Sequence, residues 1–248
     1  MKELLLKNNR QQSLKIPRII HQVYEDPAGP PDHLIQVSET WKACHPDWEY
    51  RFWDKQAIEE FMQAEFPEYI PAYNAFPFPV LRWDAIRCFI LYHYGGLYAD
   101  MDYECFEPMD SLLGDSTCCL GMEPDDNAIL HNRDMIIGNA LMASVPGHDF
   151  FKVIIDEMFT DKNGLIDVRY KGLYVMEGTG PFMFTRIYKN YREKETVTLL
   201  PAELVAPLTV DETRKIILGN ATKDIEDKVE KAFALHYFLG SWFEQLAD

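Results

Sequence analysis

Two aspartates separated by one residue, Asp100 and Asp102, follow a short apolar run and are the strongest candidates for chemistry in the sequence. In an extended chain, residues i and i+2 face the same side, so the two carboxylates would lie close together while Met101 points into the core. At about 4 Å and an effective dielectric constant near 20, they repel each other by about 4 kcal/mol. A hard divalent cation, Mg²⁺ or Mn²⁺, is therefore expected between them, together with substrate phosphates.

A second polar pair lies on the helix predicted just before that run. Asp84 and Arg87 are spaced i, i+3 in the mostly apolar segment 82–94, so they share one helix face. Asp84 is an acceptor suited to ribose or sugar hydroxyls, and Arg87 is a donor suited to a phosphate or a neighbouring carboxylate. A local ion pair on the helix surface explains the same spacing equally well.

The elements that must position these residues are bounded by proline and glycine. Pro77 and Pro79 discourage helix before the segment, and Gly95-Gly96 ends it. The following apolar run, 97–99, has the composition of a buried strand. Asp100 and Asp102 are thus expected at the carboxyl end of a strand, where ligands bind in open α/β sheets.

This stretch resembles the sugar-nucleotide-binding core of glycosyltransferase family 32. The pattern D-x-x-R, an aromatic-rich helix and GG-x-Y-x-D-x-D is matched by Asp84, Arg87, Gly95, Gly96, Tyr98, Asp100 and Asp102. The family includes yeast-type α-mannosyltransferases and bacterial capsule and lipopolysaccharide sugar transferases, and it is related to the glucosylating clostridial toxins. The resemblance implies an α/β fold of the GT-A type, a single Rossmann-like nucleotide-binding domain with a mixed central sheet.

The resemblance extends over residues 16–242 and implies further contacts to the donor. The predicted first strand, 16–24, ends in His21-Gln22-Val23-Tyr24, and the family places the last residue of this tetrad against the nucleotide base. Tyr24 replaces the more usual tryptophan, which retains stacking over a smaller area. An aromatic side chain that only closes the core at a strand end is the alternative.

Later motifs supply the remaining candidate site residues. Asn139 matches a family asparagine that holds donor-sugar hydroxyls, although a hydrogen bond to local backbone fits as well. His236, Ser241 and Trp242 reproduce an H-x-x-x-x-S-W pattern, which implies that His236 completes the metal shell and that Ser241 and Trp242 close over the diphosphate. We expect the turn 177–181 to shape the acceptor or sugar pocket.

The rest of the chain alternates between predicted helices and strands, as in an α/β nucleotide-binding domain. Glu123 and Asp125 are additional carboxylates that we expect at the surface. The remaining predictions are helices at 34–44, 56–64 and 148–158, strands at 48–54 and 118–123, a loop at 66–79 and a charged surface excursion at 211–231.

Composition narrows the function classes. The 248 residues, 47% of them hydrophobic, suit one globular domain, 1–248, with its core in 16–242. A net charge of -16 argues against nucleic-acid binding and weakly against docking on anionic lipid. No run approaches the ~18 apolar residues of a membrane span, and the five cysteines lack C-x-x-C spacing. We therefore expect a cytoplasmic protein, with peripheral membrane association and oligomeric state left open.

Together these features predict a metal-dependent glycosyltransferase, and the family resemblance implies that it retains the anomeric configuration and acts in bacterial surface-polysaccharide or capsule synthesis. Mn²⁺ or Mg²⁺ would bind to Asp100, Asp102 and His236, with the donor ribose near Asp84 and with Arg87 neutralising developing charge. The donor is a nucleotide diphosphate-sugar, a UDP-sugar being favoured over GDP-mannose, and the acceptor is a hydroxyl of a glycan or lipid-linked saccharide. The alternatives are a catalytically silent nucleotide-sugar or glycan binder and a metal-dependent phosphohydrolase.

Overall fold

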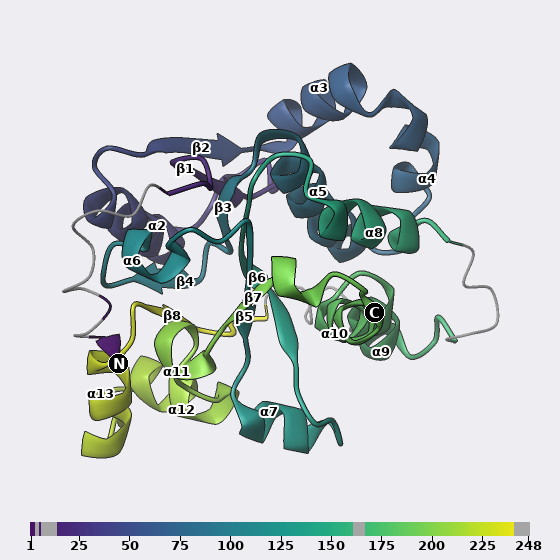
Figure 1. The fold of residues 1–248 in the computed structure, drawn as a ribbon. Helices are drawn as coiled ribbons and strands as arrows, with labels where there is room; N and C mark the ends of the chain where they lie inside the picture. The colour runs from purple at the N-terminus through teal and green to yellow at the C-terminus, as the bar shows by residue number, and fades with distance from the viewer. Residues whose placement is uncertain (3–4, 6–13, 161–166, 241–248) are drawn as a thin grey trace.

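The computed structural model describes residues 1–2, 5, 14–160 and 167–240, which form a central mixed sheet with helices on both of its faces (Figure 1). The strand order is β2-β1-β3-β6-β5-β7. These strands are β1 (Ile19–Val23), β2 (Glu49–Trp53), β3 (Gly96–Ala99), β5 (Cys118–Met122), β6 (Ile137–Ser144) and β7 (Thr198–Leu200).

The sheet is parallel except at β6. β1 pairs in parallel with β2 and β3, and β5 pairs in parallel with β7, whereas β6 runs antiparallel to both β3 and β5. Parallel neighbours need a crossover connection, and α2 (Asp32–Cys44) provides it between β1 and β2. The predicted α/β fold with a mixed central sheet is confirmed.

One face of the sheet carries the larger hydrophobic core, which includes Trp53, Phe89, Tyr98, Phe150 and Phe184. The helices on this face are α3 (Lys55–Glu65), α5 (Pro79–Tyr94), α8 (Asp149–Met158) and α10 (Pro181–Asn190). The upper and right-hand part of Figure 1 shows α3, α5 and α8 together.

The opposite face carries a second core, with Trp41 of α2 fully buried in it. A two-stranded antiparallel sheet, β4 (Tyr103–Cys105) with β8 (Ala234–His236), packs here. The short helices α6 (Asp110–Leu113) and α11 (Ala202–Val205) complete the layer.

Peripheral helices make up most of the remaining structure. They are α7 (Asp125–Leu130), α9 (Lys171–Gly178), α12 (Val210–Ile217) and α13 (Lys223–Glu230), with 3₁₀ turns η1 (Pro67–Tyr69) and η2 (Lys194–Thr196). The predicted surface excursion 211–231 thus contains two helices, the first of which begins with a capping box between Thr209 and Glu212. Among the described residues, none of the helices is long and apolar enough to span a membrane.

The helix α5 is buried on nearly all sides and is the central support of the fold. Pro79 occupies its first turn, where the missing N–H costs no helical hydrogen bond. Gly95 and Gly96 follow it with φ of 64° and 95°. A Cβ on Gly95 would lie 2.7 Å from the Ser144 carbonyl oxygen, and one on Gly96 would lie 2.6 Å from that of Ile19, so only glycine fits this tight entry into β3.

The loop predicted at 66–79 is partly wrong. It contains η1 and a short helix, α4 (Ile70–Asn74). Pro67 and Pro71 lie in the first turns of these elements, where proline is compatible with helix, and Tyr73 of α4 is buried against the core. Counting prolines as helix breakers failed here because their positions, not their number, decide the conformation.

Candidate active site

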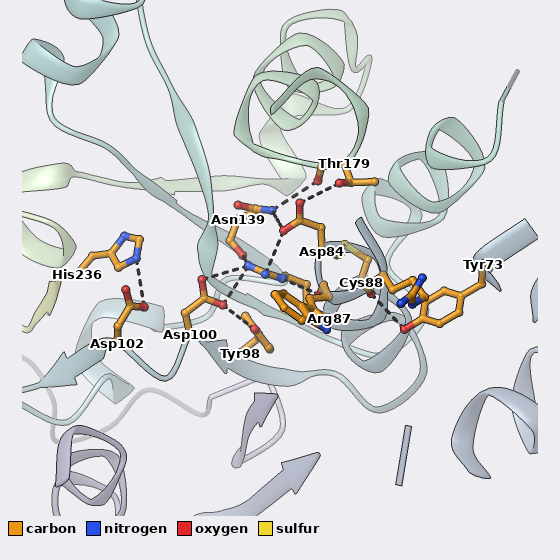
Figure 2. A network of polar contacts seen from close by, with 12 residues as sticks. Tyr73, Asp84, Arg87, Cys88, Tyr98, Asp100, Asp102, Asn139, Thr179 and His236 are labelled. Carbon is orange, nitrogen blue, oxygen red and sulfur yellow. Dashed lines mark hydrogen bonds and ion pairs between the residues drawn. The ribbon is translucent and has the colours of Figure 1, made fainter. Parts of the chain in front are cut away.

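Five polar side chains form a buried network around α5, which we call the α5 network: Asp84, Arg87, Asp100, Asn139 and Thr179 (Figure 2). The Asp84 carboxylate accepts hydrogen bonds from Asn139 Nδ2 at 2.9 Å and from Thr179 Oγ1 at 2.8 Å. Arg87 Nη2 lies 3.0 Å from Asp84 Oδ1. The i, i+3 pair predicted from the sequence is therefore buried rather than on a helix surface.

Arg87 joins α5 to the sheet. Its Nη1 donates to the carbonyl oxygen of Asn139 at 2.8 Å and lies 3.1 Å from Asp100 Oδ1. Its Nε donates to the Trp83 carbonyl oxygen at 3.1 Å. The guanidinium, 6% exposed, thus meets acceptors in several directions, as a buried cation requires.

Burial has the largest influence on the pKa of Asp84 in the α5 network. Removal from water raises the pKa of Asp84, and Arg87, Thr179 and Asn139 oppose that shift. Asp100 behaves alike: burial raises its pKa, Arg87 lowers it, and the nearby Asp102 raises it further. The network therefore holds two carboxyls that depend on one guanidinium for their negative charge.

The Asp-x-Asp segment forms a turn instead of the extended strand end that we predicted. Asp100 N–H donates to the Ala140 carbonyl oxygen, which continues the contact of β3 with β6 by one residue, and Tyr103 N–H then donates back to the Asp100 carbonyl oxygen at 3.0 Å. The turn redirects the chain from the large sheet into β4. Met101 is buried, as expected, and the two carboxylates still face one region.

Asp102 and His236 meet across the small sheet, since β4 and β8 pair Tyr103 with His236. His236 Nε2 lies 3.4 Å from Asp102 Oδ1, and Leu239 N–H donates to Asp102 Oδ2 at 2.9 Å. The His236 ring stacks on Tyr103 with centroids 4.9 Å apart. Figure 2 shows this pair beside, but separate from, the contacts of Arg87.

The charges of this pair stabilise each other. Burial lowers the pKa of His236, but Asp102, Asp100 and Glu123 outweigh burial and raise that pKa above its ordinary value. Burial also opposes ionisation of Asp102, yet His236 and the Leu239 N–H outweigh it and lower the pKa of Asp102. Without a cation, an imidazolium would thus partly balance the two aspartates.

Asp100, Asp102 and His236, which we call the carboxylate–histidine cluster, fit a divalent metal ion. One ligand atom from each lies within 4.8 Å of the others. Ligands that share one ion at about 2.0–2.6 Å are at most about 5 Å apart, so the spacing is compatible with a single ion. Two carboxylates with an imidazole suit Mn²⁺ better than Mg²⁺, which prefers oxygen ligands.

Two side chains of β1, those of His21 and Gln22, contact the backbone of the Gly95-Gly96 turn and of the Asp100 turn. His21 Nε2 lies 2.9 Å from the Gly95 carbonyl oxygen, and Trp53 Nε1–H donates to His21 Nδ1 at 3.1 Å. Gln22 donates through Nε2 to the Asp100 carbonyl oxygen at 3.2 Å. These two buried residues therefore position the backbone of the site.

Tyr24 follows β1 at the same edge of the sheet and is partly buried, with its N–H bonded to the Trp53 carbonyl oxygen. The next residue, Glu25, accepts a hydrogen bond from Trp83 Nε1 at 2.7 Å. This contact attaches the segment after β1 to α5, one residue before Asp84. Stacking of Tyr24 on a base stays a prediction.

Comparison with known proteins agrees with this geometry. Residues 31–119 match the family model for the glycosyltransferase sugar-binding region containing a DXD motif. Inositol phosphoceramide mannosyltransferase 2 of Schizosaccharomyces pombe is 32% identical over 186 residues, which are 72% of this chain and 48% of that protein. The chain belongs to the glycosyltransferases with a DXD motif. The family predicted from the sequence is confirmed.

Other relatives of this DXD glycosyltransferase are consistent with that assignment. Mannosyl phosphorylinositol ceramide synthase SUR1 of Saccharomyces cerevisiae is 33% identical over 178 residues, 71% of this chain and 43% of that protein. The chain thus spans about half the length of the curated relatives it matches. The structure of PaToxG glycosyltransferase superposes with a TM-score of 0.50 at 14% identity, covering 93% of this chain and 92% of that one, which supports the GT-A fold.

The sequence did not predict the contacts of two residues in this DXD glycosyltransferase, Glu123 and Thr179. Glu123 was expected at the surface, but it is partly buried and interacts electrostatically with His236. Thr179 was considered only as part of a pocket-shaping turn, whereas its hydroxyl binds Asp84. The glycine-containing turn 177–181 was the available signal for Thr179, and no spacing rule marked Glu123. Asp125 is exposed, as expected, and Ser241 and Trp242 lie outside the described residues.

Proposed function

We propose that this protein transfers a sugar, with mannose as the leading candidate, from a nucleotide diphosphate-sugar to a hydroxyl of a glycan or lipid-linked acceptor. The carboxylate–histidine cluster carries the proposal, because it joins the α5 network at Asp100. The relatives' names, which specify mannosyl transfer to inositol phosphoceramide, support the sugar and the lipid acceptor. The choice between UDP and GDP as donor nucleotide stays a prediction.

We propose that the protein works with Mn²⁺ held by Asp100, Asp102 and His236. The ion, when bound, supplies positive charge for the departing diphosphate. Asp100 is oriented for this role from two sides, because Tyr98 Oη–H donates to its Oδ1 at 2.6 Å and Arg87 pairs with it. His236 has to give up its proton before it can act as a ligand, and its pairing with Asp102 keeps the ring aimed at the cluster.

Within the α5 network, we assign Asp84 to the donor's hydroxyl groups and Arg87 to the orientation of Asp100. Asp84 Oδ1 is taken up by Asn139 and Arg87, whereas Oδ2 accepts one hydrogen bond, from Thr179, within the described structure and retains a second lone pair. Arg87 is committed to Asp84, Asp100 and the Asn139 carbonyl, so its charge is fixed near the cluster at no cost of rearrangement.

The reaction breaks the bond between the anomeric carbon and the phosphate oxygen, and the electron pair leaves with the diphosphate. The acceptor oxygen forms the new bond to the anomeric carbon, and its proton passes to the departing diphosphate. Retention of the anomeric configuration is part of the proposal and follows from the family resemblance. The anomer of the product, determined by NMR, tests this step.

The two alternatives are less well supported. A metal-dependent phosphohydrolase commonly uses two metal ions, and the described residues contain a single group of three possible ligands. A silent binder is expected to have lost a ligand, whereas all three are together here. A cytoplasmic location and a capsule role remain predictions from the sequence.

The proposal is tested by calorimetric titration with UDP and GDP, each with and without Mn²⁺. We expect one nucleotide to bind tightly only when Mn²⁺ is present. Turnover is then followed with GDP-mannose, UDP-glucose and UDP-galactose as donors and inositol phosphoceramide in micelles as acceptor. Mn²⁺-independent binding, or binding with neither donor breakdown nor transfer, would contradict the proposed function.

A further inference from the structure

Glu123 directly follows β5 at the edge of the sheet that carries the active site. Successive side chains of a regular strand alternate between faces, so Cys119 and Gly121 point the same way. Cys119 lies in the core beneath the small sheet β4–β8, and a Cβ on Gly121 would lie 3.5 Å from Val205 of that same core. Beyond the irregular pairing of β5 with β6, Glu123 lies towards the same face, since it interacts electrostatically with both Tyr103 and His236.

The side chain of Glu123 is held in place by its own neighbours. Asn127 Nδ2 donates to Oε2 at 3.2 Å, which is the single hydrogen bond that this carboxylate makes within the described part of the chain. Gly138 of β6 lies beside this side chain, since a Cβ there would be in ordinary van der Waals contact with Glu123 Cγ at 3.7 Å. The pairing of β5 with β6 shifts register between Leu120 and Met122, and such irregularities redirect side chains near functional sites.

Electrostatics connect this carboxylate to the cluster although it is not one of the three ligands. Burial raises the pKa of Glu123, and His236 acts in the opposite direction. Glu123 in turn contributes to the raised pKa values of His236 and Tyr103. The ligand atoms that lie close enough together to share one metal ion belong to Asp100, Asp102 and His236, and Glu123 is not among these residues. Glu123 therefore lies farther from the proposed metal position than the three residues of the carboxylate–histidine cluster do.

The strand order indicates which part of the substrate would lie between Glu123 and the carboxylate–histidine cluster. Tyr24 follows β1 and Asp100 follows β3, whereas Glu123 follows β5, on the other side of β3 from β1. With a spacing of about 4.8 Å between strands, the ends of β5 and β3 are roughly 10 Å apart, so a sugar bound beyond the sheet edge could contact residues that follow both strands. A donor with its base at Tyr24 and its diphosphate at the cluster would direct its sugar towards β6 and β5. The far side of that sugar is where an acceptor must approach.

We propose that Glu123 binds the acceptor substrate, accepting a hydrogen bond from a hydroxyl of the sugar or inositol ring that receives the transferred sugar. This inference rests on the proposed function and names the acceptor side of the same site. The carboxylate orients the acceptor and leaves unchanged which bonds form and break. A hydroxyl that donates to an ionised carboxylate binds more strongly than one that donates to a neutral amide.

The test separates acceptor binding from donor chemistry. Wild type, Glu123→Gln and Glu123→Asp are assayed with Mn²⁺ and GDP-mannose or UDP-glucose, first without acceptor to measure donor hydrolysis, then with inositol phosphoceramide in micelles to measure transfer. Asp125→Asn, an exposed carboxylate nearby, is the matched control. Mn²⁺ affinity is measured for every variant.

We expect Glu123→Gln to lower kcat/KM for the acceptor by about 10- to 100-fold, the value of a hydrogen bond to a charged group. Its donor hydrolysis, donor KM and Mn²⁺ affinity should match wild type, and Glu123→Asp should recover part of the transfer. Equal loss of hydrolysis and transfer, reduced Mn²⁺ affinity, or unchanged transfer would each overturn the assignment. Wild type that neither hydrolyses nor transfers from any donor would overturn the proposed function itself.

Discussion

The α5 network and the carboxylate–histidine cluster share Asp100 but satisfy their charges differently. In the network, Arg87 meets two carboxylates and a carbonyl oxygen, and both oxygens of Asp84 accept hydrogen bonds. In the cluster, two carboxylates converge on one histidine that is charged only when protonated. The network is complete without a ligand, whereas the cluster gains a balancing charge when a cation binds.

This difference separates stability from chemistry. Buried ions that have all their partners are costly to disrupt, because removing one partner leaves another charge uncompensated. Converging like charges are unfavourable in the absence of a cation, so substituting one of them costs little stability and removes a ligand. Substitutions in the network should therefore unfold the protein, and substitutions in the cluster should inactivate it.

Arg87→Ala should have the largest effect and should act on stability. It leaves the buried Asp84 and the partly buried Asp100 without their cation, which we expect to lower the free energy of unfolding by about 3 to 5 kcal/mol. Urea denaturation of the metal-free protein measures the change. Arg186→Ala is the control, because Arg186 pairs with Glu157 at the surface and should cost less than about 1 kcal/mol. Equal losses in the two variants would remove the distinction between the regions.

Asp102→Asn should act on turnover instead. We expect transfer to fall by about 10²- to 10³-fold, as when one preorganised electrostatic group is removed. The melting temperature without metal should fall only slightly, because the loss of the pair with His236 is offset by the loss of repulsion with Asp100, and the amide oxygen can still accept from Leu239 N–H. Asp211→Asn, at an exposed position, is the control. Retained Mn²⁺-dependent turnover would contradict the role of Asp102.

The two buried histidines extend the comparison to pH. His21 accepts a hydrogen bond at Nδ1 from Trp53 and faces a carbonyl at Nε2, so its neutral form fits its site, and burial lowers its pKa to about 4. In His236, by contrast, the nearby carboxylates outweigh burial and raise the pKa. His21 should therefore oppose folding in acid, whereas His236 holds its proton more tightly in the folded protein.

Because the folded pKa of His21 lies below the unfolded value of about 6.5, its contribution to stability is complete above pH 6.5 and is lost as the pH falls towards 4. The loss should reach about 3 kcal/mol, from roughly 1.4 kcal/mol per pKa unit. We expect the stability difference between wild type and His21→Gln to shrink by that amount between pH 7.5 and 4.5, measured by urea denaturation. A constant difference would show that His21 does not titrate there.

Tyr24→Ala should have the smallest effect, confined to donor binding. Loss of stacking should weaken nucleotide affinity about fivefold to tenfold, or roughly 1 to 1.4 kcal/mol. Stability should change little because Tyr24 is only partly buried. Tyr170→Ala, at an exposed position, controls for loss of an aromatic side chain, and calorimetry with the bound nucleotide is the measurement. An unchanged affinity would assign Tyr24 to packing alone.

Local signals made the central part of the fold predictable. The end of α5 and the start of β3 follow from the Gly95-Gly96 pair, whose backbone conformations few other residues adopt. The helix starts at Pro79, three residues before the predicted start, because proline fits the first turn of a helix. The meeting of Asp100, Asp102 and His236 was expected because the family motif fixes their order and spacing. These features depend on short stretches of chain or on a recognisable pattern.

The contacts that were missed depend on tertiary structure. The turn at Asp100 forms because the chain passes from the large sheet to the small one, and an alternating pattern does not contain that change. The partnership of Thr179 with Asp84 joins residues 95 positions apart. The direction of Glu123 depends on an irregular pairing between β5 and β6, which leaves no periodic mark in the sequence.

The pairing of β4 with β8 has a consequence for biosynthesis. Leu239, whose N–H donates to the Asp102 carboxylate, is 137 positions away from Asp102 in the sequence. The strand β8 also supplies His236. Because chains are made from the N-terminus, β8 leaves the ribosome after every other strand of the described residues. We expect the large sheet to assemble on the nascent chain before the cluster is complete. Tight metal binding would then begin only after the large sheet has folded. Unfinished chains would therefore not bind the ion in a wrong arrangement.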